Sequence, residues 1–267
     1  MPFSSASVVR TEALSDRFRR IVLHVEDPAA LNLPDAADTA VGVYFDPADG
    51  EGRNYSVRTQ DGPAITLDVA THCGGPGTRW AATAVPGQRV GLDHARAWHR
   101  PGPGTDWQLL VSDLSGLPAA ARILEQMAPD ERAILFAEVA DRRDLDYLPW
   151  HPGVVVRPHI GTGNGHAPSD LARAVRAYRL PPGRGYCWFA GEAGQSRLVR
   201  KYLRGRGWTI DQYDITGYWR QGSEEWDERF AAAGGDALSV YARALAAGKD
   251  GKVAFEEFDH ACEQAGL

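Results

Sequence analysis

Alternating apolar and polar positions in the first part of the chain predict short β-strands. The pattern covers residues 6–25, 41–45, 54–58, 64–71 and 88–92. Turn-forming residues separate several of these segments, as at 46–50, and one helix is expected at 78–84. Short strands at close spacing, with turns between them, are typical of a small antiparallel β-barrel.

From about residue 105 the pattern changes to unbroken apolar segments that alternate with helical periods. Strands are predicted at 107–111, 132–139, 154–156, 186–190 and 209–213, and helices at 117–127, 170–178 and up to about residue 204. Apolar strands of this kind are typical of a parallel sheet that is covered by helices on both faces.

The positions of Pro- and Gly-rich segments divide the chain into three parts. Residues 96–105, rich in Pro and Gly, are the expected linker, and two or three helices are expected after Gly222. The predicted fold class is therefore a β-barrel plus an α/β domain. We expect the barrel at 1–100, the α/β domain at 106–222 and a helical extension at 223–267.

The composition is that of an ordinary globular chain, with 43% hydrophobic and 24% charged residues. No apolar run approaches the ~20 residues of a membrane-spanning helix. The N-terminus lacks the pattern of a signal peptide, so a cytoplasmic location is expected. The three cysteines, Cys73, Cys187 and Cys262, form no CxxC pair, which argues against structural zinc, a cysteine-ligated iron–sulfur cluster and a disulfide framework.

The net charge of −6 belongs to the last part of the chain. Residues 223–267 hold ten acidic and four basic residues, and the preceding part holds 25 of each sign. The sequence shows no basic face, so nucleic acid is not an expected partner. The histidines lack metal-ligand spacing and no G-x-S-x-G motif occurs, so neither a bound metal nor a serine hydrolase is expected.

The first candidate site lies on the strand predicted at 54–58. Period-two alternation places Arg53 and Tyr55 on one face and Ser56 on the other. A tyrosine ring can stack on an isoalloxazine, a serine hydroxyl can bond its polar edge, and an arginine can hold a phosphate. An ordinary strand with an exposed arginine and a core tyrosine has the same pattern, so both interpretations stay open.

A glycine-rich turn, residues 74–80, follows this strand and leads into the predicted helix. Glycines let the backbone approach a ligand closely. A helix N-terminus offers N–H groups and a positive dipole end to a pyrophosphate, and Thr78 is a candidate N-cap. Turns with the order Gly-Pro-Gly also occur without any ligand. Together with the strand motif, however, the turn favours a flavin dinucleotide.

Three further segments, 113–122, 188–193 and 217–222, complete an ordered set of motifs. In this order and spacing the chain resembles the siderophore-interacting proteins, flavin-dependent ferric-siderophore reductases, over residues 6–222. The resemblance implies a ferredoxin-reductase-like two-domain flavoprotein. FAD would bind the barrel, and NADPH or NADH would bind the α/β domain.

The resemblance also implies site residues, position by position. The FAD-binding positions would be Arg53, Tyr55, Ser56, Asp68, Val69, His72, Gly75, Pro76, Thr78 and Trp80. The nicotinamide would dock at Asp113, Gly191 and Glu192, and Tyr218 and Trp219 would return toward the flavin. Many ferric siderophores are anionic, so Arg220 and Arg100 are candidates for substrate binding. No catalytic side chain and no metal ligand is implied.

The resulting functional hypothesis is the reduction of ferric siderophores. NADPH or NADH would pass a hydride to FAD, or ferredoxin would supply electrons, and single electrons would then reach Fe(III). Fe(II) is held less well by hard oxygen donors, so reduction would release the metal. Two alternatives stay open: a flavoprotein reductase with another acceptor, and a siderophore- or flavin-binding protein without turnover.

The chain also departs from the family pattern. Cys73 replaces a usual glycine, and residues 113–116 read Asp-Leu-Ser-Gly where the family usually has Asp-Glu-Thr-Ala. The second change leaves the details of the nicotinamide pocket open.

Two glycine-containing segments are expected to carry no ligand. Residues 161–165, Gly-Thr-Gly-Asn-Gly, lack the GxGxxG spacing and do not follow the first strand of the predicted sheet. We expect a flexible connector there. Residues 250–257 resemble half of a calcium loop but lack two oxygen ligands.

Overall fold

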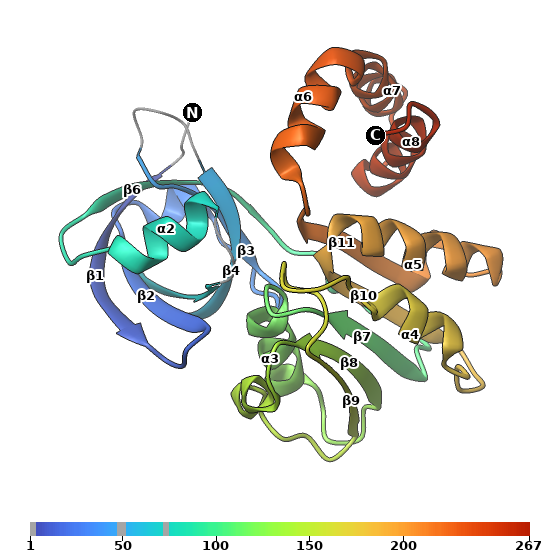
Figure 1. Ribbon diagram of the computed structural model, residues 1–267, viewed down its shortest axis with the longest axis horizontal. Coiled ribbons are helices and arrows are strands. Elements are labelled where there is room, and N and C mark those ends of the chain that lie inside the picture. The colour runs from blue at the N-terminus through green and yellow to red at the C-terminus, as the bar shows by residue number, and fades with distance from the viewer. Residues whose placement is uncertain (1–3, 47–51, 72–74) are drawn as a thin grey trace. The chain divides into compact units, whose positions relative to one another are not determined.

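The computed structural model describes residues 4–46, 52–71 and 75–267 (Figure 1). The chain forms two compact units, Met1–Trp219 and Arg220–Leu267. The first unit contains a β-barrel and a parallel sheet, which confirms the predicted fold class. The division of the chain into domains at 1–100, 106–222 and 223–267 stays a prediction.

A closed antiparallel barrel forms the N-terminal part of the first unit. Its strands are β1 (Ser4–Ala13), β2 (Phe18–Val25), β3 (Ala40–Tyr44), β4 (Gly52–Asp61), β5 (Ala64–Ala70) and β6 (Arg89–Arg96), in the order β1-β2-β5-β4-β3-β6. The segment expected to be extended over 6–25 is thus two paired strands. Apolar side chains such as Ile21, Leu23 and Leu67 are fully buried inside.

Two short helices accompany the barrel, α1 (Pro28–Leu31) and α2 (Pro76–Thr83). Helix α2 confirms the predicted helix but begins two residues earlier, because Pro76 suits the first helical turn. It runs beside the barrel strands (Figure 1) and buries Trp80 and Ala81 against them.

A parallel sheet forms the second part of the unit. Its strands are β7 (Trp107–Ser112), β8 (Ala133–Val139), β9 (Val154–Ile160), β10 (Gly185–Glu192) and β11 (Tyr213–Trp219), in the order β11-β10-β7-β8-β9. All neighbouring pairs are parallel. Every residue of β7 and β8 is buried, which explains their largely apolar sequence.

The last strand of the sheet differs from the prediction. Residues 209–213 were expected to be a strand, but Thr209 instead forms a capping box with Gln212. This box starts a short 3₁₀ turn, η2 (Ile210–Gln212), and β11 begins only at Tyr213. The polar side chains at 209 and 212 therefore override the local apolar pattern.

Helices cover both faces of the sheet (Figure 1). They are α3 (Leu117–Gln126), α4 (Leu171–Ala177) and α5 (Ala193–Gly205), with a 3₁₀ turn η1 (Arg142–Tyr147) after β8. Helix α3 packs on one face with Leu110, Leu135 and Trp188, and α4 and α5 pack on the other. Because all strands are parallel, their carboxyl ends meet at one edge, where such sheets bind ligands.

A buried carboxylate joins the barrel to the sheet. Asp38, which precedes β3, accepts hydrogen bonds from the backbone N–H groups of Trp98 (3.0 Å) and His99 (2.8 Å) in the linker. It also accepts one from the indole of Trp188 on β10 (3.0 Å). Asp38 is 0% exposed, so this contact fixes both the linker and a central strand to the barrel.

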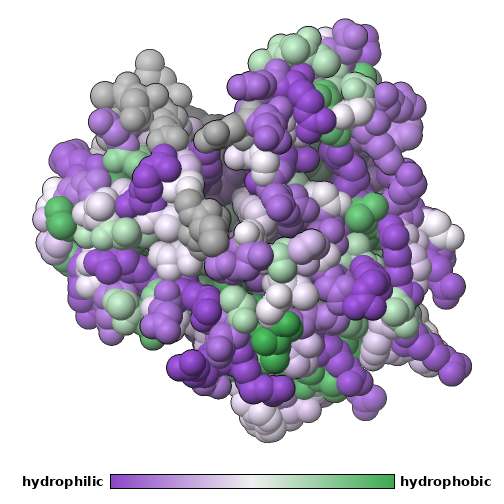
Figure 2. Space-filling model, in the orientation of Figure 1, coloured by the Kyte–Doolittle hydropathy of each residue, from purple (hydrophilic) through white to green (hydrophobic). Residues whose placement is uncertain are grey.

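The second unit, Arg220–Leu267, contains α6 (Ser223–Ala233), α7 (Gly235–Ala246) and α8 (Gly251–Gln264). Its small core contains Ala237, Cys262 and Leu267, with Phe230 and Phe258 partly buried against them. The helical extension is therefore confirmed. No helix of the described residues has the length and apolar character needed to cross a membrane, and hydrophilic residues predominate on the face seen in Figure 2.

Candidate functional site

Three aromatic rings gather between the barrel and helix α2. Tyr55 on β4 lies 5.9 Å from Trp80 and 6.3 Å from Phe45, measured between ring centroids. Phe45 and Trp80 stack at 5.0 Å. Burial raises the pKa of the Tyr55 hydroxyl. A side chain at Gly77 would collide with that hydroxyl, so the glycine is what lets the Tyr55 ring approach the helix.

Helix α2 holds two buried polar atoms without a hydrogen-bond partner among the described residues. They are Thr78 Oγ1 and Trp80 Nε1. Buried polar groups normally have partners, and leaving one unsatisfied costs about 1–3 kcal/mol. An oxygen atom of a phosphate bound at the first turn would give the Thr78 hydroxyl an acceptor, and the positive end of the helix favours such an anion.

Gly75, and not Thr78, is the N-cap of α2. Its φ of +92° suits glycine, and no atom lies within 4 Å of the position that a Cβ would take. Pro76 follows in the first turn. Among the described residues, the space around that Cβ position is therefore open. His72 lies outside the described residues.

The remaining flavin candidates on the barrel have partners of their own. Arg53 is exposed and donates to the Gly52 carbonyl (2.7 Å). The Asp68 carboxylate accepts two hydrogen bonds from Arg20 (2.8 Å each) and one from the Tyr147 hydroxyl (2.5 Å). Val69 is a core residue, 1% exposed. The Asp68 side chain is thus occupied by protein donors and that of Val69 lies in the core, and both residues pair with β2.

At the carboxyl edge of the sheet, Asp113 and Trp219 are joined directly. The Trp219 indole N–H donates to Asp113 Oδ2 (2.6 Å), and the Ser115 N–H donates to Oδ1 (2.9 Å). Burial raises the pKa of Asp113 to about 6, against the opposing effect of these hydrogen bonds. A Cβ at Gly191 would lie 3.0 Å from the same carboxylate, so the site needs a small residue there.

The neighbouring end of β11 reaches the barrel. The buried Ser56 hydroxyl donates to the hydroxyl of Tyr218 (3.4 Å), and burial raises the pKa of Tyr218. Glu192, at the end of β10, accepts from the Gln195 N–H (2.9 Å) and caps α5. Two consecutive residues of β11 therefore connect the candidate sites: Tyr218 contacts Ser56 of the barrel, and Trp219 contacts Asp113 of the sheet.

The two predicted substrate-binding arginines belong to different units. Arg100 is an exposed residue of the linker, and its N–H donates to the Tyr186 hydroxyl (2.8 Å). Arg220 opens the second unit, where its guanidinium carbon lies 4.3 Å from the centroid of the Trp226 ring. Within the described parts of the chain, no group of three or more His, Cys, Asp or Glu residues is arranged to hold a metal ion.

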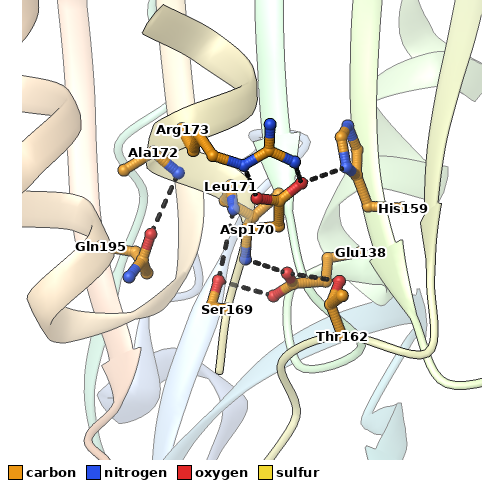
Figure 3. Close-up of polar contacts among 9 residues, drawn as sticks. All are labelled: Glu138, His159, Thr162, Ser169, Asp170, Leu171, Ala172, Arg173 and Gln195. Carbon is orange, nitrogen blue, oxygen red and sulfur yellow. Dashed lines mark hydrogen bonds and ion pairs between the residues drawn. The ribbon is translucent and has the colours of Figure 1, made fainter. Parts of the chain in front are cut away.

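A polar cluster at the carboxyl ends of β8 and β9 was missed in the sequence (Figure 3). The carboxylate of Glu138, 0% exposed, accepts hydrogen bonds from Thr162 Oγ1 (2.9 Å), Ser169 Oγ (2.7 Å) and the Asp170 N–H (2.6 Å). Asp170 in turn pairs with His159 and Arg173. One signal was present: Glu138 is the single charged residue in an otherwise apolar strand.

Comparisons with known proteins agree with this architecture. A family model described as "Siderophore-interacting protein" matches residues 105–222. The chain is 31% identical to a siderophore utilization protein from T. fusca of known structure, with a TM-score of 0.70 over 82% of this chain and 92% of that one. It is 30% identical over 187 residues to the ferric vibriobactin reductase of Vibrio cholerae, covering 65% of this chain and 66% of that protein.

The fold alone is shared more widely. A ferredoxin NADP+ reductase from Neisseria gonorrhoeae, solved with bound FAD and NADP, superimposes with a TM-score of 0.60. It is 14% identical, and the match covers 82% of this chain and all of that one. The barrel followed by a parallel sheet is therefore the ferredoxin-reductase arrangement.

Proposed function

Because the chain belongs to the siderophore-interacting protein family, we propose that it reduces ferric siderophores with the help of bound FAD. The ferric vibriobactin reductase of Vibrio cholerae supports this reaction by its similarity. The observation that carries the proposal is a pair of buried atoms in α2 without partners among the described residues, Thr78 Oγ1 in the first turn and Trp80 Nε1 two residues later. Such a pair fits a phosphate-bearing cofactor.

On the barrel, the residues of the aromatic cluster would hold FAD. The Tyr55 ring would lie along the isoalloxazine, and the Ser56 hydroxyl would bond its polar edge. Around the diphosphate and the flavin edge would lie Arg53, Asp68, Val69, His72, Gly75, Pro76, Thr78 and Trp80. Bound FAD would supply the redox chemistry, because it accepts electrons in pairs and releases them singly.

At the sheet edge, Asp113 would position Trp219 for the electron donor. The 2.6 Å hydrogen bond fixes the plane of the indole, and Gly191 leaves room beside it. Together with Glu192, these residues would border a reduced nicotinamide, from NADPH or NADH. Reduced ferredoxin is the other donor that this proposal admits.

Fe(III) would enter as substrate, within a siderophore, and needs no ligand from the protein. Arg220 and Arg100 would attract the anionic complex, because local positive charge raises the encounter rate of an anion. Hard oxygen donors hold Fe(II) less well than Fe(III), so one electron suffices to loosen the metal. The expected cytoplasmic location belongs to the same proposal.

The first test is FAD binding to the purified protein and to Thr78→Val, which keeps the side-chain shape and removes the hydroxyl. We expect yellow protein from the wild type and roughly tenfold weaker FAD binding by the variant, because a hydrogen bond to a phosphate is lost. Thr83→Val is the matched control, since Thr83 bonds only to carbonyls of its own helix. A wild-type protein that stays colourless with excess FAD would defeat the proposal.

The second test separates the reductase from its alternatives. Under anaerobic conditions we expect NADPH, NADH or reduced ferredoxin to bleach the flavin, and a ferric siderophore to restore its colour with release of Fe(II). Reoxidation by quinones or ferric citrate alone would indicate a different acceptor. A flavin that no donor bleaches would indicate a binding protein.

A further inference from the structure

The turn between β7 and α3 has no N–H group left for a phosphate. In sheets of this kind, the N–H groups between the first strand and its helix are where a dinucleotide places its diphosphate. Here each has a protein acceptor: Asp113 N bonds Ala190 O (3.4 Å), Leu114 N bonds Asn164 Oδ1 (2.8 Å), Ser115 N bonds Asp113 Oδ1 (2.9 Å), Gly116 N bonds Asp113 O (3.1 Å) and Leu117 N bonds Leu114 O (3.4 Å).

The helix beyond this turn offers no replacement. Pro118 has no N–H, and the next residue, Ala119, is 1% exposed. The turn is also pressed against β10, because a Cβ at Gly116 would collide with the Ala190 carbonyl. A diphosphate therefore finds no free N–H donor among residues 113–118 at the start of α3.

Of these five acceptors, Asn164 Oδ1 is the side-chain atom that comes from outside the turn, 50 residues along the chain from Leu114. It belongs to residues 161–165, which we call the strap. Its side-chain oxygen takes the Leu114 N–H, and its Nδ2 donates to the carbonyls of Glu138 (3.3 Å) and Thr162 (3.1 Å). Asn164 is 3% exposed, so its amide lies buried where a phosphate oxygen would otherwise accept.

The backbone of the strap is built for this placement. Four of its five residues have positive φ, including Asn164 at 58°, and the other three are glycines. This segment was expected to be a flexible connector, but its glycines are explained by the positive φ angles that the strap requires. It turns the chain so that one amide reaches from the end of β9 to the end of β7.

Glu138 anchors the strap through Thr162 (Figure 3). Its carboxylate accepts from Thr162 within the strap and from Ser169 and Asp170 just after it. In dinucleotide-binding sheets an acidic residue after the second strand bonds the ribose. Glu138 lies near the end of β8, the second strand in sequence, but it is fully buried and its oxygens bond protein groups instead.

The charges at this edge also oppose a diphosphate. Asp113 and Glu138 are buried carboxyls, and each disfavours a further negative charge nearby. The neighbouring basic side chains, those of His159 and Arg173, both contact the Asp170 carboxylate (Figure 3). The edge thus has no unpaired cation in this cluster to offset the carboxyls.

We propose that Asn164 plugs the diphosphate position of the α/β domain and thereby determines which electron donors bind. The inference rests on the proposed function and refines it. NADH and NADPH must displace the strap or dock without their diphosphate on this turn, so both bind weakly. A donor without a dinucleotide, such as a reduced iron–sulfur protein, is unaffected by the plug.

The test is a calorimetric titration of the FAD-loaded protein with NAD+ and with NADP+. Asn164→Gly keeps a residue that tolerates positive φ and exposes the Leu114 N–H. We expect both dinucleotides to bind roughly tenfold more tightly, because a hydrogen bond to a charged acceptor becomes available. Hydrogen exchange at the Leu114 amide should accelerate, which reports that the plug is open.

Asn32→Gly is the matched control. Asn32 is the other described non-glycine residue with positive φ (47°), and it caps α1 on the barrel. Its replacement should change neither dinucleotide affinity nor exchange at Leu114. Adenosine, which has no phosphate, serves as the control ligand and should bind Asn164→Gly no better than the wild type.

A second variant keeps the inference testable if Asn164→Gly fails to fold. Thr162→Val removes one of the bonds to Glu138 and should loosen the strap, with dinucleotide binding about threefold tighter. Unchanged or weaker binding in a folded variant whose Leu114 amide exchanges faster would overturn the inference. Failure of the proposed function looks different, because the wild-type protein would then not retain FAD.

Discussion

Asp113 is the residue whose charge state matters most at the sheet edge. It lies inside the protein, and burial raises its pKa from 3.8 to about 6, although Ser115 and Trp219 donate to it. The folded protein therefore binds the Asp113 proton more tightly than the unfolded chain does. The contribution of this residue to stability is complete below about pH 4 and is lost as the pH rises through about 6.

This sign gives a prediction for Asp113→Asn, which cannot ionise. Between about pH 4 and pH 7 the wild type should lose up to about 3 kcal/mol of unfolding free energy relative to the variant. Denaturant unfolding at both pH values measures the difference. Parallel pH profiles of the two proteins would contradict the assigned burial of the charge.

At the scale of elements, the contact between β4 and α2 depends on a missing side chain. Gly77 lies where the hydroxyl of Tyr55 meets the helix, and a Cβ there would overlap it. Alanine normally stabilises a helix relative to glycine by about 1 kcal/mol. Overpacking costs about 1–3 kcal/mol, so steric conflict should win over helix propensity here.

Gly77→Ala should therefore lower the melting temperature and weaken FAD binding, since it displaces the ring of Tyr55. Adding Tyr55→Phe should restore the melting temperature, because it removes the colliding oxygen and leaves the ring carbon 3.3 Å from the new methyl group. Gly102→Ala, with no atom within 4 Å of its Cβ position, should be nearly neutral. A double variant no more stable than Gly77→Ala would refute the steric explanation.

The sequence predicted those elements whose burial follows a simple period. Buried strands β7 and β8 are mostly apolar, and the barrel strands alternate, so both halves of the fold could be predicted. The strand expected at 209–213 was wrong because a capping box between Thr209 and Gln212 competes with strand pairing. Local polar hydrogen bonds of this kind leave little trace in hydrophobic periodicity.

The candidate site was predictable only where its residues are neighbours in sequence. Tyr55, Thr78 and Trp80 lie in short motifs, and the structure gathers them at α2. Asn164 was not predictable, because its partner Leu114 is 50 residues away. Hydrogen bonds between residues far apart in the chain depend on the order of strands in the sheet, and hydrophobic periodicity does not predict that order.

For the first unit as a whole, Asp38 decides how the barrel meets the sheet. Its carboxylate accepts from Trp98, His99 and Trp188, which belong to the linker and to β10. Asp38→Ala would leave these donors buried without an acceptor. Each buried donor without an acceptor lowers the unfolding free energy by about 1–3 kcal/mol. The lost contacts are those that align the barrel with the sheet.

We expect Asp38→Ala to lower the unfolding free energy by at least about 3 kcal/mol. The flavin candidates of the barrel stay in place, so FAD affinity should change little, while bleaching by NADPH should slow. Asp35→Ala, an exposed neighbour, should shift stability by no more than about 0.5 kcal/mol. Equal effects of the two substitutions would contradict the role given to Asp38.

The order of strands has one more consequence, at the rim of the sheet. Among the described residues β9 is an edge strand of the sheet, and its exposed side chains include Val155, Val156 and Ile160. The backbone groups of Gly153 and Gly161 bond to β8, so the backbone N–H and C=O groups of odd-numbered residues in β9 point toward β8. Those of even-numbered residues point away from the sheet. Pro158 is among the latter and offers no donor to an incoming strand. The edge is therefore apolar, but Pro158 interrupts the row of N–H donors to which a strand of another molecule could pair.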